Sequence, residues 1–238
     1  MVALPNALHT EVTEAAIARV LEAMELSAGV VHPDLELRYL PVTNAVDRLA
    51  ASGKIGRVLT AKVGLSCNWG YDGGDWNQDV EGDGLFLFLA CWYLDVLDKI
   101  IKAEPIEANV VGGRGMNGSL LDYGWASLRY NNGVLGQFDF NLLSGQDAEI
   151  TLNVCGEDGE VAADLQRGVW RWRQHSGSWH EENTPCSEPV HGFAGMRESI
   201  TAFISAITKG NGDDNVSVCR RVHQTAMLCH EQDMAIRS

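Results

Sequence analysis

The chain has 238 residues, of which 45% are hydrophobic, and this is enough for one full core and at most a fragment of a second domain. Its formal net charge of −14 repels phosphate backbones and anionic lipid surfaces, so the composition argues against nucleic acid or a membrane as a partner. No apolar run has the length of a membrane span, and the N-terminus lacks the basic start and apolar core of a signal peptide. The sequence therefore predicts a cytoplasmic protein.

The N-terminal part of the chain is predicted to be helical. Residues 7–28 carry apolar side chains at the spacing of one continuous amphipathic helix: Val12, Ala16, Val20 and Met24. Asn6 stands directly before this segment, where its side chain can cap the helix. Within residues 35–58 a second helix is predicted, and Gly53 ends it.

Strand patterns follow from residue 59 onward. The predicted strands cover residues 59–67, 106–111, 125–130, 134–143, 149–154, 160–163 and 169–173. Asn131, Asn132 and Gly133 predict a tight turn between two of them, and short connections between successive strands favour a largely antiparallel open sheet. Two helices, at about residues 196–208 and 217–236, are predicted to close the chain.

Two sequence features resemble ligand sites without the expected surroundings. The run from Gly113 to Gly118 has the GxGxxG spacing of a dinucleotide turn, but a strand-like segment follows it instead of a helix, so we predict a hairpin connection. Cys219, His223 and His230 share one face of the last helix, yet His230 lies too far along the axis to share a zinc ion with Cys219. The six cysteines lack Cys-x-x-Cys spacing, so free thiols and no metal site are expected.

The stretch from residue 76 to residue 99 reads WNQDVEGDGLFLFLACWYLDVLDK and predicts a polar, glycine-containing loop that leads into one buried helix. Helical spacing places Phe88, Trp92 and Asp95 on the same face of that helix. We expect the functional site on this face.

This stretch resembles the signature of the glucose-fructose oxidoreductase / inositol dehydrogenase / rhizopine catabolism (Gfo/Idh/MocA) family. In that family a Trp, a Gly triplet and a helix with an Asp and a later His build a sugar-oxidising site. Trp76 matches the Trp, and residues 82–84 (Gly-Asp-Gly) match the triplet. Phe88 falls where the family's Asp belongs, and Trp92 falls where its catalytic His belongs.

The resemblance covers nearly the whole chain and implies an α/β fold. Residues 35–238 are expected to form a single open, mostly antiparallel sheet with helices packed on one face, like the C-terminal domain of the family. Residues 1–34 are expected to be a remnant of the dinucleotide-binding domain, because residues 2–9 resemble the end of its fourth strand. No complete Rossmann domain is expected, and the family's Glu-Lys-Pro motif is absent from the fused helix.

The second face of the sheet is predicted to be mixed in polarity. Alternation along two strands places these side chains on it: Trp125, Ser127, Arg129, Leu135, Gln137 and Asp139. Such a face suits a wet or oligomeric surface. The resemblance implies a homodimer through this face, or pairing with a full-length relative.

Hydride transfer to a nicotinamide needs a bound cofactor and a base for the substrate proton. The sequence lacks the family's cofactor turn and the Glu-Lys-Pro lysine, and Phe88 and Trp92 replace its two proton-handling residues. An indole can donate a hydrogen bond but cannot accept one, and a phenyl ring can neither donate nor accept one. We therefore expect no NAD or NADP site.

The remaining polar residues of this region are the candidates for the site. Asp79 and Asp95 are predicted to be catalytic, although the family's Asp at the position of Asp95 is mainly structural. The predicted substrate-binding residues are Arg38, Tyr39, Trp76, Asn77, Phe88 and Trp92. For Arg38 and Tyr39 a salt bridge or capping role stays open, and Phe88 and Trp92 could instead fill space left by the absent domain.

The leading hypothesis is an enzyme without a cofactor that binds a polyol-like or cyclic small molecule. It would perform proton-transfer chemistry such as elimination, isomerisation or cyclisation. Two alternatives stay open: a non-catalytic accessory subunit of a full-length relative, and an NAD(P)-dependent oxidoreductase with a rebuilt cofactor site or a borrowed nucleotide domain.

Overall fold

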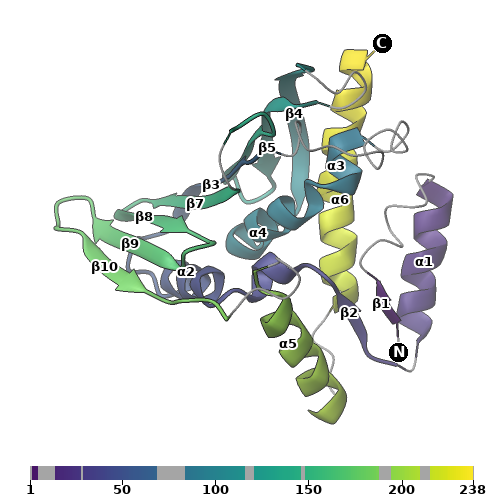
Figure 1. The fold of residues 1–238 in the computed structure, drawn as a ribbon, viewed down its shortest axis with the longest axis horizontal. Helices are drawn as coiled ribbons and strands as arrows, with labels where there is room; N and C mark the ends of the chain where they lie inside the picture. The colour runs from purple at the N-terminus through teal and green to yellow at the C-terminus, as the bar shows by residue number, and fades with distance from the viewer. Residues whose placement is uncertain are drawn as a thin grey trace.

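The computed structural model describes residues 2–4, 14–27, 29–68, 84–115, 121–145, 148–187, 194–209 and 215–237. Its centre is one open sheet (Figure 1). The strands of this sheet, in chain order, are β3 (Val58–Ser66), β4 (Pro105–Gly113), β5 (Tyr123–Tyr130), β6 (Leu135–Asn141), β7 (Glu149–Gly156), β8 (Gly159–Asp164), β9 (Val169–Gln174) and β10 (His180–Asn183). In space they follow the order β10-β9-β8-β7-β3-β6-β5-β4.

The pairing of these strands confirms the predicted open, mostly antiparallel sheet. Every neighbouring pair is antiparallel except β3 and β6, which are parallel. Antiparallel hairpins such as β5–β6 need only a short turn, here Asn131 to Gly133. The strand β3 instead lies between β6 and β7, so both of its neighbours in the sheet come from much later in the chain. This insertion and the short edge strand β10 were not predicted.

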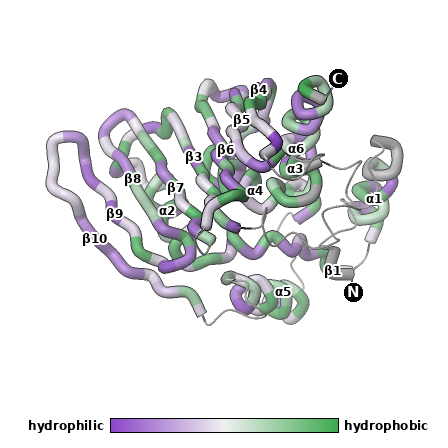
Figure 2. The backbone as a smooth tube through the Cα atoms, turned by 45° about the horizontal axis from the view of Figure 1, so that its top comes forward, coloured by the Kyte–Doolittle hydropathy of each residue, from purple (hydrophilic) through white to green (hydrophobic). Residues whose placement is uncertain are grey.

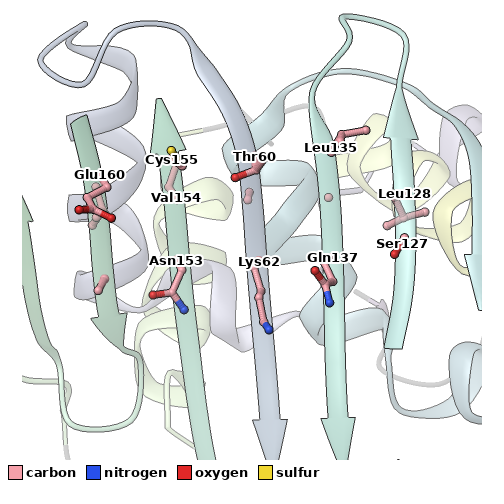
Figure 3. Close-up of a pocket in the computed structure, with 14 residues that line it drawn as sticks. Thr60, Lys62, Ser127, Leu128, Leu135, Gln137, Asn153, Val154, Cys155 and Glu160 are labelled. Atoms are coloured by element: carbon pink, nitrogen blue, oxygen red, sulfur yellow. The ribbon is translucent and has the colours of Figure 1, made fainter. Parts of the chain in front are cut away.

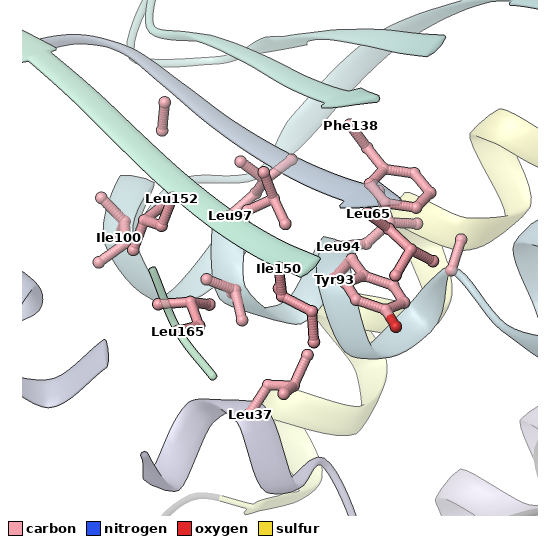
Figure 4. Close-up of a cluster of buried hydrophobic side chains, with 14 of the residues drawn as sticks. Leu37, Leu65, Tyr93, Leu94, Leu97, Ile100, Phe138, Ile150, Leu152 and Leu165 are labelled. Atoms are coloured by element: carbon pink, nitrogen blue, oxygen red, sulfur yellow. The ribbon is translucent and has the colours of Figure 1, made fainter. Parts of the chain in front are cut away.

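Helices cover one face of the sheet, as predicted. They are α2 (Pro41–Ala51), α3 (Gly84–Phe88), α4 (Cys91–Ile101) and α6 (Asn215–Arg237). Hydrophobic and hydrophilic residues alternate along the central strands (Figure 2), so β3, β5, β6, β7 and β8 turn their apolar side chains towards these helices. Figure 4 shows Leu94 and Leu97 of α4 packed against Leu65, Phe138 and Leu152 of the sheet. This buried layer fixes the position of α4 relative to the strands.

The opposite face of the sheet has no helix on it among the described residues. Trp125 and Leu135 are 45% and 46% exposed there, and Lys62 and Asp139 form an ion pair on the same face. The predicted mixture of apolar and polar side chains on this face is therefore observed. The homodimer through it stays a prediction.

The N-terminal residues form a small βαβ unit. Strand β1 (Val2–Leu4) pairs in parallel with β2 (Val31–Pro33), and helix α1 (Glu14–Leu26) connects them. The prediction of one helix over residues 7 to about 28 is confirmed for residues 14–26, since the described helix ends at Leu26 and the chain then enters β2. Asn6 and the predicted helix start lie outside the described residues. The domain boundary after residue 34 stays a prediction.

The predicted single helix after the loop is broken in two. The amides of Leu89 and Ala90 both donate to the Leu85 carbonyl, at 2.9 and 3.0 Å, and this ends α3 before α4 begins at Cys91. A donor five residues after its acceptor is the signature of a π-type turn, which shifts the phase of the following turns. The spacing between residues 88 and 92 is therefore not that of a straight helix.

Two helices close the chain as predicted. They are α5 (Met196–Lys209) and α6, and the short 3-10 helix η1 (Glu36–Tyr39) contacts α5. α6 runs along the side of the sheet and packs on α4 and β4 (Figure 1). None of the described helices combines the length and the apolarity that crossing a membrane requires.

Candidate functional site

The site lies where η1 packs against α4. The single N–H of the Trp92 indole is shared between two acceptors, Glu36 Oε2 at 2.6 Å and the Asp34 carbonyl oxygen at 3.0 Å. One turn further along α4, Asp95 Oδ1 accepts a hydrogen bond from Arg38 Nη1 at 2.7 Å. Two side chains of η1 are therefore each held by a side chain of α4.

The local sequences explain this arrangement. In the LELRYL segment, Leu35, Leu37 and Leu40 enter the core, so the polar residues between them remain beside the surface of α4. Helix α4 is buried on nearly all sides, and within it only Trp92 and Lys99 are partly exposed. Burial of the leucines thus brings Glu36 and Arg38 to Trp92 and Asp95.

Glu36 is the carboxyl group with the most unusual environment in the site. Its residue is 8% exposed, and burial raises its pKa to about 7. The nearby carboxylates of Asp34 and Asp95 raise the pKa further, while the hydrogen bond from Trp92 opposes the rise. At neutral pH the carboxyl group is therefore divided between its acid and carboxylate forms.

Asp95 is fully enclosed. It is 1% exposed, and burial raises its pKa, whereas the guanidinium of Arg38 lowers it. Its Oδ2 is buried and has no hydrogen-bond partner in the part of the chain that the structure describes. The ion pair supports the structural role of the family's Asp at this position, and it is the salt-bridge role that the sequence left open for Arg38. A catalytic role for Asp95 stays a prediction.

His32 connects the site to α5. Its Nε2 lies 3.0 Å from Ser199 Oγ, and its ring stacks on Tyr39 with centroids 5.1 Å apart and is the same distance from the ring of Phe203. Burial and the charge of Arg38 lower the pKa of His32. The imidazole is therefore neutral at pH 7, and it serves to hold β2, η1 and α5 together.

The structure brings together half of the predicted site residues: Arg38, Tyr39, Trp92 and Asp95. Trp76, Asn77 and Asp79 lie outside the described residues, and only the backbone of Phe88 is described, in α3. Sequence reasoning missed Glu36 and His32. A charged Glu36 between two leucines was a usable signal, because a lone carboxylate in an apolar run needs a partner.

The described residues contain no cluster of side chains that could hold a metal ion. Within these ranges no group of three or more His, Cys, Asp or Glu side chains comes together, and all six cysteines are free. Gly113 ends β4, which pairs antiparallel with β5, so this run is not a strand-to-helix dinucleotide turn. The passage from β1 to α1, residues 5–13, contains no glycine. These residues do not fit the pyrophosphate of NAD(P).

A sequence profile of the GFO/IDH/MocA C-terminal domain matches residues 43–162, which is about half of the chain. The chain belongs to the Gfo/Idh/MocA family. The matched range extends from α2 to β8 and includes α4 with Trp92 and Asp95. The family resemblance and the fold class predicted from the sequence are both confirmed.

Solved structures of Gfo/Idh/MocA-type oxidoreductases share this fold. Levoglucosan dehydrogenase in complex with NADH and levoglucosan matches with a TM-score of 0.77 and 16% identity, over 93% of this chain and 69% of that one. An oxidoreductase from Sinorhizobium meliloti matches with a TM-score of 0.75 and 13% identity, over 95% of this chain and 69% of that one. An oxidoreductase domain protein from Kribbella flavida matches with a TM-score of 0.72 and 16% identity, over 93% of this chain and 67% of that one. No curated protein sequence gives a significant match.

Proposed function

We propose that this Gfo/Idh/MocA protein binds a polyol-like or cyclic small molecule beside η1 and α4. We propose that it moves a proton on this molecule without a nicotinamide, in an elimination, isomerisation or cyclisation. The observation that carries the proposal is the buried Glu36 carboxyl, held 2.6 Å from the Trp92 indole nitrogen and with a pKa of about 7. A general acid or base is most effective when its pKa lies near the working pH.

Glu36 supplies both halves of such a reaction. As a carboxylate it accepts a proton from a C–H or O–H group of the substrate, and as an acid it returns that proton to another atom of the same molecule. Protons and electrons then balance within one substrate, so no co-reactant is required. Trp92 holds the carboxyl in place through its N–H and offers an apolar ring face to the C–H groups of a sugar-like ring.

Arg38 is the proposed donor to a substrate oxygen. Its side chain is 14% exposed, and Asp95 fixes one of its terminal nitrogens, so the rest of the guanidinium keeps a defined direction. Asp79, Trp76 and Asn77 remain proposed site residues from the preceding loop. Asp79 is the second candidate for acid–base chemistry.

Exchange of carbon-bound hydrogen in D2O tests this proposal without knowledge of the product. Levoglucosan and a panel of cyclic polyols are incubated with the protein, and loss of C–H signals is followed by proton NMR. We expect exchange with at least one compound, and a loss of about a hundred-fold or more in Glu36→Gln. The exposed Glu182 of β10 provides the matched control, Glu182→Gln. Exchange that is unchanged in Glu36→Gln would remove Glu36 from the chemistry.

A second candidate is an NAD(P)-dependent oxidoreductase with a rebuilt cofactor site. Its support is that levoglucosan dehydrogenase, which shares the fold, was solved with NADH, and that this chain covers 69% of that protein. Titration with NADH and NADPH, followed through the seven tryptophans, distinguishes the two candidates. Saturable binding to the isolated chain would favour this second candidate.

A further inference from the structure

The buried position of Glu36 separates its carboxyl group from bulk water. The residue is 8% exposed, and its Oε2 accepts the indole N–H of Trp92 at 2.6 Å. A proton that Glu36 takes from a substrate can be replaced by one from solvent only if another group carries it across this gap. Such a group must lie close to Glu36 and must itself reach the solvent.

Asp34 meets both conditions. Its carbonyl oxygen lies 3.0 Å from the Trp92 indole nitrogen that also bonds Glu36 Oε2, so the two acidic residues lie against the same ring. Leu35 between them packs into the core. The side chain of Asp34 stays partly exposed, and its carboxyl group has no hydrogen bond or ion pair in the part of the chain that the structure describes. It is therefore free to take up and release a proton.

The two carboxyl groups act on each other electrostatically. The charge of Asp34 contributes to the raised pKa of Glu36, and burial raises the pKa of Asp34 as well. A proton moves readily between two groups whose pKa values are close. The rise at Asp34 narrows its difference from Glu36 and thus favours transfer between them.

The other titratable groups around Glu36 are too enclosed to reach solvent. Asp95 is 1% exposed and is held by Arg38 at 2.7 Å. The Cys91 thiol and the Tyr93 hydroxyl are buried, and burial raises the pKa of each well above neutrality. At pH 7 these two groups keep their protons.

More distant titratable groups do not provide a route either. His32 is 5% exposed, and its Nε2 is bonded to Ser199 of α5. Carboxyl groups on the opposite face of the sheet, such as Glu160 (Figure 3), point away from the helices, so the sheet separates them from Glu36. Among the described residues, Asp34 is thus the partly exposed carboxyl group beside Glu36.

We propose that Asp34 relays protons between the solvent and Glu36. This inference rests on the acid–base role of Glu36 proposed above. The O–H bond of a protonated Asp34 breaks and its proton passes to the Glu36 carboxylate, directly or through one bridging water molecule. Asp34 then regains a proton from solvent, so charge and atoms balance without another reactant. The relay determines whether a proton taken from the substrate returns to the same molecule or is exchanged.

The rate at which Glu36 changes its protonation state tests the proposal without a substrate. A laser-induced pH jump near the Glu36 pKa of about 7 perturbs this equilibrium, and the emission of Trp92 reports the relaxation. Comparison with Trp92→Phe isolates the signal of this indole. We expect the relaxation to slow by about ten-fold or more in Asp34→Asn and to stay near the wild-type rate in Asp34→Glu.

The matched control is Asp158→Asn, which removes an exposed carboxyl group in the turn between β7 and β8. Circular dichroism melting verifies that each variant is folded. A relaxation rate that Asp34→Asn leaves unchanged would overturn the relay, and so would an equal slowing in Asp158→Asn. The relaxation does not depend on turnover. If the wild type shows no C–H exchange in D2O, the proposed function fails while the relaxation rate still decides the relay, so the two failures are distinguishable.

Discussion

The indole nitrogen of Trp92 donates a 2.6 Å hydrogen bond to the Glu36 carboxylate across 56 residues of sequence. This bond joins a helix of the central layer to the short segment that enters the domain. Because Glu36 is 8% exposed and its carboxyl group has a pKa of about 7, ionisation of this group changes the electrostatic environment of Trp92 near neutral pH. The pair therefore provides its own spectroscopic readout.

We expect the tryptophan emission of the wild-type protein to show a step near pH 7. The step should disappear in Glu36→Gln, which cannot ionise, and in Trp92→Phe, which lacks the reporting indole. A pH titration of fluorescence measures it, with Trp179→Ala as the control that removes a different indole. A step that persists in Glu36→Gln would mean that another group titrates beside the tryptophans.

Stability should fall as the pH rises from about 4.5 to about 7. The pKa of Glu36 is raised in the folded state, so over this interval the folded protein holds a proton that the unfolded chain has already lost. The contribution of Glu36 to the free energy of unfolding is fully present below the pKa that the group has in the unfolded chain. It is lost as the pH rises through the pKa of the folded state, by a total of about 3 kcal/mol at most. Urea unfolding at several pH values should show a smaller fall in Glu36→Gln than in the wild type. An equal fall in both would contradict the raised pKa.

Asp98 should extend the fall in stability to higher pH. Burial raises its pKa to about 8, although it accepts hydrogen bonds of 2.8 Å from the hydroxyl groups of Tyr130 and Thr225. Tyr130→Phe removes one of these donors and leaves a buried acceptor unpaired, so we expect a loss of about 1–3 kcal/mol in urea unfolding. The loss should grow with pH, because the bond favours the charged form. A loss that is the same at all pH values would assign the effect to packing alone.

The Arg38–Asp95 pair should behave as a coupled unit. Arg38→Met leaves Asp95 buried without its counter-charge, and we expect a loss of about 3–5 kcal/mol in unfolding free energy. The double variant Arg38→Met with Asp95→Leu should recover most of this loss, because neither charge then remains buried. Urea unfolding of the two single variants and the double variant gives the coupling energy. Additive losses would show that the two side chains act independently.

The two faces of the sheet should respond differently to the same truncation. Leu152 is 0% exposed against α4, whereas Leu135 is 46% exposed on the open face. We expect Leu152→Ala to cost about 2–5 kcal/mol and Leu135→Ala less than about 1 kcal/mol, measured on the isolated chain at low concentration. A large, concentration-dependent loss in Leu135→Ala would instead indicate that copies of the chain associate through this face.

The sequence by itself determined the strands β3 to β9, the hairpin turn at Gly133, the closing helices and the family. Alternation with period two and turn residues such as Asn132 and Gly133 are local properties, so they can be seen without the fold. The resemblance to the family's signature selected Arg38, Trp92 and Asp95 as candidate site residues, and their role in a site stays a prediction.

Only the tertiary structure decided which of these residues meet. The insertion of β3 between β6 and β7, the break between α3 and α4, and the contact of Glu36 with Trp92 all depend on contacts between distant segments. Local patterns state which face of a segment is apolar, but not which other segment covers it. The burial of Leu35 and Leu37 beside α4 determines that η1 packs on this helix. It also places the Glu36 carboxyl group where low solvent exposure raises its pKa.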